Sequence, residues 1–310
     1  MNKHVLVYGD VFVDYIAEDE TNSSFQTYLG CATVNVAAGI ARLGVPVSFI
    51  TVTGSDETSQ FVRKELQKEG VDLSSSIEIP EKRVNGVYVH LTPEYDRVFV
   101  NYQNETPDLQ VTAEDLKKET FQQASILHIC SGTMFHPTAL HTTKEAVRIA
   151  KASGALVSFD ANIRPLRWAS EDSCRKTTVS FLSEADLVKL TEEELTFMMN
   201  TKTLEEGLCK LESFSVPIVL ITQGEKGTLA IIDGKSIQIP AVKATAVDTT
   251  GAGDAFMAGV LRQMHTQGET LTLTDVSMWK DIIRFGNEMG ARCVTKAGAL
   301  SAMPYAHELL

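Results

Sequence analysis

The feature that most restricts the fold of this chain is a repeated order of short β-branched run, helical stretch and glycine. Val47–Thr53 is typical of a buried strand, and Glu57–Glu69 has helical spacing and stops at Gly70. The alternation returns between residues 125 and 222. It predicts a doubly wound α/β fold, in which helices cover both faces of a mostly parallel central sheet. The expected strands are Val5–Gly9, Val47–Thr53, Ser125–Cys130, Ala155–Asp160, Asp186–Leu190 and Pro217–Thr222, and the expected helices are Thr33–Leu43, Glu57–Glu69, Thr138–Ser153, Glu171–Ser183 and Glu192–Met199.

Two stretches, Val11–Leu29 and Arg83–Asn104, break this order because apolar and polar residues alternate in them. Such alternation is typical of half-buried antiparallel strands, and Thr92–Asp96 reads as a turn between two of them. We expect one domain over residues 1–310, with lid strands inserted at about 11–29 and 83–104 that pair into a small antiparallel β-sheet. The alternative is an antiparallel extension of the main sheet.

The charge balance limits how the chain can bind anions. It has 28 Lys and Arg residues against 40 Asp and Glu residues, a net charge of −12, so we expect no nucleic acid partner. Phosphates would have to be held by a local arrangement of backbone amides.

Nothing in Met1–Tyr15 has the length or hydrophobicity of a signal peptide or a membrane span, so we expect a cytoplasmic protein without a membrane partner. The five cysteines show no paired spacing, which favours reduced thiols, and the histidine spacing does not favour a structural zinc.

The segment most informative about chemistry is Ala246–Val260, in which a loop of small residues leads directly into an apolar helix. The helix should begin at about Ala252, so that the backbone N–H groups of Gly251, Ala252 and Gly253 form an anion hole. Asp254 lies in the first turn, where it could accept a proton from a hydroxyl that attacks a phosphoryl group. The alternative is a helix start with an acidic residue that favours the helix dipole.

Two other glycine patterns are dismissed. Asp233–Ser236 ends like a phosphate-binding P-loop, but it reads as the turn of a hairpin. Gly251 and Gly253 could open a dinucleotide fingerprint, but Phe256 stands where the third glycine is needed.

The order of these motifs resembles the ribokinase-like, or PfkB, carbohydrate kinases nearly end to end. Asp248–Asp254 is similar to the C-terminal signature of that family, and Gly30–Ala37 to the N-terminal one, with Cys31 in place of the second glycine. The resemblance implies that Asp254 is the catalytic base, that Gly30 and Asn35 bind the sugar, and that Asp14 hydrogen-bonds its hydroxyls. It also implies ATP and Mg²⁺ as cofactors.

Asp160–Trp168 resembles a segment of the fructokinase and 2-keto-3-deoxygluconate kinase branch, which makes Arg164 a substrate contact. Arg167, in the same loop, is expected to be a surface residue. In that branch the lid commonly ends in Tyr-Arg, whereas this chain has Tyr102-Gln103, which favours a neutral sugar. Tyr88 and Tyr102 are expected to pack on the sugar face or to cover the apolar side of the lid.

The remaining motifs concern the nucleotide and the ions. In Lys189–Glu194 the resemblance places Lys189 on the cofactor side and Glu194 near Mg²⁺ through water, with Thr191 at the position of the family's Asn. The alternative for the acidic residues is a solvated helix N-terminus. Lys296–Ala299 matches a segment that lines a K⁺ site in many members. The nucleotide contacts implied by the resemblance are Thr222, Gly224, Gly227 and Asn287.

The expected function is therefore ATP-dependent phosphorylation of a small sugar, most simply fructose, by a homodimer that associates through the lid. The alternatives are a keto-sugar-acid kinase, such as one for 2-keto-3-deoxygluconate, a nucleoside kinase, or a sensor of sugar or nucleotide without catalysis.

Overall fold

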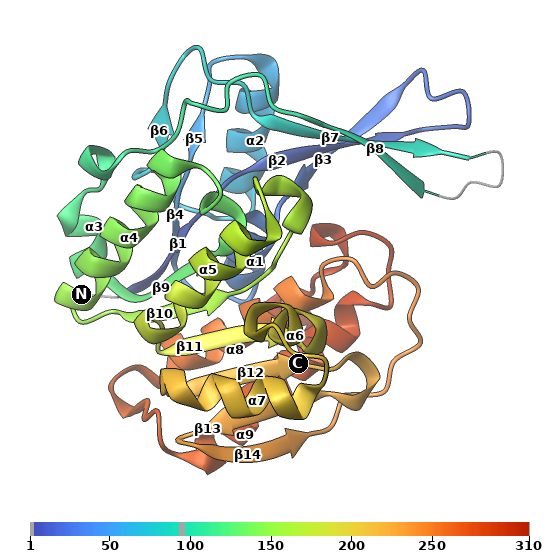
Figure 1. Cartoon of the computed structure of the whole chain (residues 1–310). Coiled ribbons are helices and arrows are strands. Elements are labelled where there is room, and N and C mark those ends of the chain that lie inside the picture. Colours follow the sequence, from blue (N-terminus) through green and yellow to red (C-terminus); the bar gives the residue numbers. More distant parts are fainter. Residues whose placement is uncertain (1–2, 93–96, 310) are drawn as a thin grey trace.

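The computed structural model describes residues 3–92 and 97–309, and its centre is an eight-stranded sheet (Figure 1). The strand order is β14-β13-β12-β11-β10-β9-β1-β4. Neighbouring strands from β4 to β12 pair parallel. Strand β13 pairs antiparallel with both β12 and β14. The strands are β1 (His4–Tyr8), β4 (Val47–Ile50), β9 (Ala124–Cys130), β10 (Leu156–Asp160), β11 (Leu187–Thr191), β12 (Ile218–Thr222), β13 (Thr228–Ile232) and β14 (Lys235–Ile239).

Helices cover both faces of this sheet, which confirms the predicted doubly wound fold. Trp279 and Phe49 lie in the core on one face, and Phe121 and Phe159 in the core on the other. Strands buried on both sides explain why the sequence showed continuous apolar runs instead of alternation. The helices are α1 (Ala32–Arg42), α2 (Glu57–Lys68), α3 (Lys118–Gln122), α4 (Pro137–Ala152), α5 (Glu171–Ser180), α6 (Glu192–Met199), α7 (Leu204–Leu211), α8 (Ala252–Gln267) and α9 (Val276–Cys293).

Local predictions hold with small shifts in the bounds. The expected strand Val47–Thr53 divides into β4 and the short β5 (Val52–Thr53), which pairs with β6 (Ile77–Glu78) outside the main sheet. The Asp233-Gly234 turn joins β13 to β14, so the P-loop interpretation was rightly dismissed.

The lid is a separate four-stranded sheet made of β2 (Phe12–Ala17), β3 (Phe25–Gly30), β7 (Asn85–Leu91) and β8 (Arg97–Gln103). Its order is β3-β2-β7-β8, and Figure 1 shows it projecting from the α/β core. The two outer pairings are antiparallel as predicted, but β2 and β7 pair parallel. Both strands leave the core at the same edge and run outward, since their first residues, Phe12 and Asn85, are paired. Most of the predicted turn at Thr92–Asp96 lies outside the described residues.

The parallel strands place their carboxyl ends at one edge of the main sheet. Asp10 follows β1, Ser131 follows β9, Asp160 ends β10 and Thr191 ends β11. This edge is where α/β folds bind ligands, and it faces the first turn of α8. No helix in the described part of the chain has both the length and the apolar character needed to cross a membrane.

Candidate active site

The anion hole predicted at Gly251–Gly253 forms at the N-terminus of α8. The helix begins at Ala252, and Gly251 has φ +77°, a backbone conformation that favours glycine. A Cβ on Gly251 would lie 2.6 Å from the Cβ of Ala299, so a larger residue would collide. The expectation was wrong in one detail, because the N–H of Ala252 donates to the carbonyl of Thr249 (3.2 Å). Within the described residues the N–H groups of Gly251 and Gly253 make no such bond, so these two amides are the donors available to an anion.

Asp254 lies half-buried in the first turn of α8 and contacts α1. The side-chain amide of Asn35 donates a hydrogen bond of 2.8 Å to its carboxylate. Burial raises the pKa of Asp254 to about 6, while the bond from Asn35 and the charges of Lys189 and Arg164 oppose that rise. A carboxylate with such a pKa is ionised at neutral pH and can still accept a proton.

Asn35 has an unused acceptor beside this carboxylate. It is 5% exposed, and its Oδ1 atom has no hydrogen-bond partner among the described residues. A buried polar atom without a partner is costly, so the position is suited to a ligand hydroxyl. The sequence predicted a sugar contact at Asn35, and this atom fits that role.

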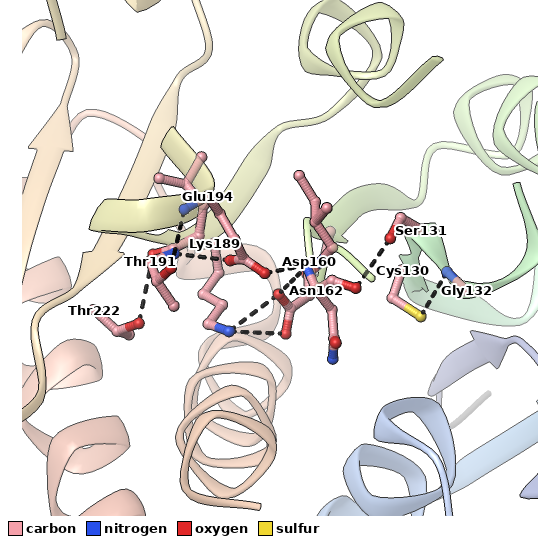
Figure 2. Close-up of polar contacts among 12 residues, drawn as sticks. Cys130, Ser131, Gly132, Asp160, Asn162, Lys189, Thr191, Glu194 and Thr222 are labelled. Carbon is pink, nitrogen blue, oxygen red and sulfur yellow. Dashed lines mark hydrogen bonds and ion pairs between the residues drawn. The ribbon is translucent and has the colours of Figure 1, made fainter. Parts of the chain in front are cut away.

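A buried ion pair lies beneath the anion hole (Figure 2). The Nζ atom of Lys189 is 3.1 Å and 3.2 Å from the two carboxylate oxygens of Asp160. The same Nζ lies 3.2 Å from where a Cβ on Gly253 would stand, so the ammonium packs against the start of α8. Burial acts to lower the pKa of Lys189, but the carboxylates of Asp160, Glu194 and Asp254 hold it above its usual value. The ammonium therefore lies, paired with Asp160, next to the first turn of α8.

Glu194 takes part in the capping of the α6 N-terminus and also bonds to the loop after β10 (Figure 2). Its carboxylate accepts hydrogen bonds of 2.8 Å from the N–H groups of Thr191 and Ile163. The hydroxyl of Thr191 in turn accepts from the N–H of Glu194, which completes a capping box. Burial raises the pKa of Glu194.

These contacts bear on the predicted Mg²⁺ site. Each carboxylate oxygen of Glu194 keeps a lone pair after accepting one hydrogen bond, so water bound to a magnesium ion fits there. Among the described residues no three acidic, histidine or cysteine side chains are grouped to hold a metal directly. The donor set is compatible with a metal bound through water and phosphate, and the contact of Glu194 with Mg²⁺ stays a prediction.

Asp14 lies on the lid face that carries Phe12 and Gly30. Its carboxylate leaves no room for a side chain at Gly30, where a Cβ would be 2.5 Å from its oxygen. Burial raises the pKa of Asp14 to about 6. Tyr102 lies on the same face, and its ring meets that of Phe12 edge to face at 6.2 Å.

Tyr88 departs from the expectation that both lid tyrosines could pack on the sugar face. Strand register pairs Tyr88 with Tyr15 and Val87 with Asp14, so Tyr88 and Asp14 point to opposite faces. Tyr88 stacks on Tyr15 at 4.8 Å and meets Phe25 at 5.4 Å. Tyr88 therefore packs against the far face of the lid, which was the alternative interpretation.

The side-chain amide of Gln103, at the end of β8, donates a hydrogen bond to the carboxylate of Glu105.

Of the two arginines in the loop after β10, only Arg167 differs from its expected position, and the substrate contact of Arg164 stays a prediction. Arg164 is exposed, donates to the neighbouring carbonyl of Ile163 (3.0 Å), and lies close enough for its charge to lower the pKa of Asp254. Arg167, expected on the surface, is instead only 15% exposed and lies 3.4 Å from the carboxylate of Asp10. Sequence reasoning missed this pair because Asp10 and Arg167 are distant in the chain. The one available signal was that both follow strands whose ends meet.

The predicted nucleotide residues lie around the end of β12 and the start of β13. The hydroxyl of Thr222 donates to the carbonyl of Leu190 (3.4 Å), and Gly224 and Gly227 have positive φ in the loop that follows. A Cβ on Gly227 would be 2.2 Å from the carbonyl of Ile239, so that position requires glycine.

Asn287 has a structural role in the described part of the chain. Its Oδ1 accepts from the hydroxyl of Thr228 (2.7 Å), and its Nδ2 donates to the carbonyls of Ile239 and Pro240. It thus joins α9 to β13 and to the end of β14. These bonds account for Asn287 without a nucleotide, so its contact with the base or ribose stays a prediction.

Comparison with known proteins assigns the family. The model of the pfkB family carbohydrate kinases matches residues 2–306. The chain belongs to this family. It is 34% identical to fructokinase of Vibrio alginolyticus over 306 residues, covering 99% of this chain and 97% of that protein. It is also 34% identical to fructokinase of Salmonella typhimurium over 310 residues, covering 100% and 99%. This pfkB-family protein is accordingly a carbohydrate kinase.

Solved structures agree with the fold of this kinase. A fructokinase from Vibrio cholerae O395, with fructose, ADP and calcium bound, superposes with a TM-score of 0.88 at 30% identity, covering 99% of this chain and 98% of that one. A fructokinase from Xylella fastidiosa with bound ATP gives a TM-score of 0.90 at 29% identity, covering 100% and 97%. The central sheet with its small lid is thus the ribokinase-like fold.

Proposed function

We propose that this kinase transfers the γ-phosphoryl group of ATP to a hydroxyl of fructose. The observation that carries the proposal is the half-buried Asp254 at the start of α8, bonded to Asn35, whose Oδ1 has no partner in the described chain. A sugar hydroxyl held there would have a base and a hydrogen-bond acceptor beside an anion hole.

Each group around Asp254 contributes to this reaction. Asp254 removes the proton from the attacking hydroxyl, and Asn35 orients both the base and the sugar. The amides of Gly251 and Gly253 and the ammonium of Lys189 stabilise negative charge on the transferred phosphoryl group. Mg²⁺, held through water at Glu194, would offset phosphate charge when bound.

Fructose is favoured over the other candidate substrates by two observations. The lid ends in Gln103, not in an arginine that could pair with a sugar acid, and the fructokinases compared above are similar over almost the whole chain. The alternatives stay 2-keto-3-deoxygluconate, a nucleoside, or binding without turnover. The chain is also 26% identical to aminoimidazole riboside kinase from Salmonella enterica. The substrates tested should therefore include a riboside.

Asp254→Asn in a coupled assay of ADP release tests the base. With Mg-ATP and fructose, the variant should lose about 10²–10⁴-fold in kcat because a general base typically contributes that much. Nucleotide binding, followed by calorimetry, should persist. The panel should include 2-keto-3-deoxygluconate, ribose and adenosine, with the exposed Asp281→Asn as the control variant. Near-normal turnover by Asp254→Asn, or no turnover of fructose by the unchanged protein, would reject the proposal.

The pH profile gives a second measurement of the same base. Because Asp254 is active only when ionised and its pKa is about 6, kcat/KM should be constant at higher pH and fall as pH drops through 6. The decline should approach about tenfold per pH unit. Enzyme held at low pH and assayed again at pH 7.5 controls for unfolding. A profile that stays flat well below pH 6 would contradict this role.

We also propose K⁺ at Lys296–Ala299, dimerisation through the lid, and a cytoplasmic location. The carboxylate of Asp248 accepts from the N–H of Gly298 (2.9 Å), which ties this segment to the catalytic loop. The five cysteines are free thiols, as expected in a reducing compartment. Assays in K⁺ against Na⁺ test the first proposal, and the second is tested in the Discussion.

A further inference from the structure

A second polar pair lies at the carboxyl edge of the sheet, and the phosphoryl transfer described above does not use it. The guanidinium of Arg167 is 3.4 Å from the carboxylate of Asp10. It lies over the ring of Phe135 at 4.0 Å and over that of Phe12 at 4.8 Å. Phe12 opens the first lid strand, so Arg167 connects the base of the lid with the loop after β10. Figure 1 shows these two elements rising from the same edge of the core.

Comparison with Arg42 shows that Arg167 has hydrogen-bonding capacity left. Arg42 also stacks on an aromatic ring, that of Tyr305, and its side chain is 8% exposed. It uses Nε, Nη1 and Nη2 in bonds to Glu69 and to two backbone carbonyls. Arg167 makes one long bond within the described chain. A guanidinium has five N–H donors, so most of those on Arg167 are available to a ligand.

The pair lies beside the lid face that carries Asp14, because Arg167 lies over the ring of Phe12, which is on that face. The hydroxyl of Thr33 donates to the backbone carbonyl of Asp10 (2.9 Å), which fixes Asp10 against the start of α1. Asn35, one half-turn further along α1, bonds to Asp254. A sugar held between Asp254 and Asp14 would therefore have the pair beside its non-reacting end.

The charges around Asp10 are partly balanced. It is 12% exposed at the side chain, and burial raises its pKa, while the cations Arg167 and Lys82 oppose the rise. The pair thus presents a carboxylate acceptor and guanidinium donors side by side. A hydroxyl can donate to one and accept from the other, as neither a carboxylate nor an apolar group can.

We propose that Asp10 and Arg167 form a specificity pair that binds a hydroxyl at the non-reacting end of a neutral sugar. This inference rests on the proposed sugar kinase function and deepens it. The pair selects against sugar acids because the carboxylate of Asp10 would repel a second carboxylate. It thereby adds the core loop to the discrimination proposed at the lid position of Gln103.

The test compares Arg167→Met and Asp10→Asn with the unchanged kinase. Arg167→Met should raise KM for fructose about tenfold or more, because a charged hydrogen-bond donor is lost, while KM for ATP stays within about twofold. Asp10→Asn should shift the ratio of kcat/KM for 2-keto-3-deoxygluconate over fructose upward by about tenfold, since Arg167 becomes free to pair with a carboxylate. Arg175→Met is the matched control, because Arg175 also stacks on a ring, that of Phe197, and pairs with an aspartate.

The outcomes separate the inference from the function on which it rests. If the unchanged protein phosphorylates no sugar, the proposed function fails and the inference fails with it. If fructose is phosphorylated but Arg167→Met keeps its KM within about twofold, only the inference is overturned. Equal losses for ATP and fructose, with a lowered thermal midpoint, would indicate a structural role and also overturn it. Should Arg167→Met not fold, the substrate ratio of Asp10→Asn decides, since a structural role would not move that ratio.

Discussion

At the scale of single residues, Cys31 is the clearest departure from an ordinary chain. It has φ +93° and ψ 138° directly before α1, a backbone conformation that side chains rarely adopt. The resemblance to the family predicted glycine there, and the conformation explains why. Cys31 is nevertheless packed against the core, and burial raises the pKa of its thiol to about 11. The site thus contains a strained residue held by its surroundings.

Glycine and alanine substitutions measure this strain. At Cys31 we expect the glycine variant to be more stable than the alanine variant by about 1–2 kcal/mol, because a Cβ is unfavourable at positive φ. At Cys174, inside α5, we expect the alanine variant to be more stable than the glycine variant by about 1 kcal/mol, since glycine destabilises a helix. Urea denaturation of the four variants gives the two differences in free energy of unfolding. The same order at both positions would show that Cys31 is not strained.

At the scale of elements, the N-terminus of α6 joins stability to the site. Thr191 ends β11 and caps α6, and its capping-box partner Glu194 also holds the loop after β10. The family's Asn at this position is itself a good N-cap residue, so the change to threonine keeps the cap. This explains how the chain departs from the family pattern without losing the geometry around Glu194.

Removal of the cap should separate these two roles. Thr191→Ala should cost about 1 kcal/mol of stability, whereas Thr191→Asn should be nearly neutral, because asparagine also caps helices. Thr203 is the N-cap of α7, and Thr203→Ala is the matched control with a similar cost. Only Thr191→Ala should also raise the Mg²⁺ concentration needed for half-maximal activity. An unchanged Mg²⁺ requirement would contradict the role given to Glu194.

At the scale of the whole molecule, the lid has an exposed edge. Strand β8 lies at the end of the lid sheet, and Val98, Val100 and Tyr102 on it are 44–49% exposed. An edge strand with exposed apolar side chains invites pairing with another sheet. A second copy of the lid is the partner that we propose.

Solution mass tests this association. We expect light scattering to give twice the 33.9 kDa of one chain, and Val98→Glu with Val100→Glu to give a monomer, because buried charges oppose the interface. Val242→Glu, at a position that is 46% exposed and outside the lid, should leave the mass unchanged. A monomer at every concentration of the unchanged protein would reject the proposal.

Much of the architecture could be predicted because it depends on local patterns. Apolar runs, glycine stops and the loop before Ala252 act over a few residues, so the main sheet and the start of α8 followed from the sequence. The parallel pairing of β2 with β7 did not, since alternation gives no strand direction. Tyr88 was ambiguous for a similar reason, because its face depends on which residue of β2 it pairs with.

The sequence by itself determined the doubly wound fold and predicted the anion hole and the proposed base, because each depends on residues that are neighbours in the chain. The tertiary structure decided which distant groups meet. It brought Asn35 to Asp254, Lys189 beneath Gly253, and Arg167 to Asp10. These contacts set the pKa of the base and the shape of the sugar site, and no local pattern encodes them, because they arise only when parallel strands bring their carboxyl ends to one edge.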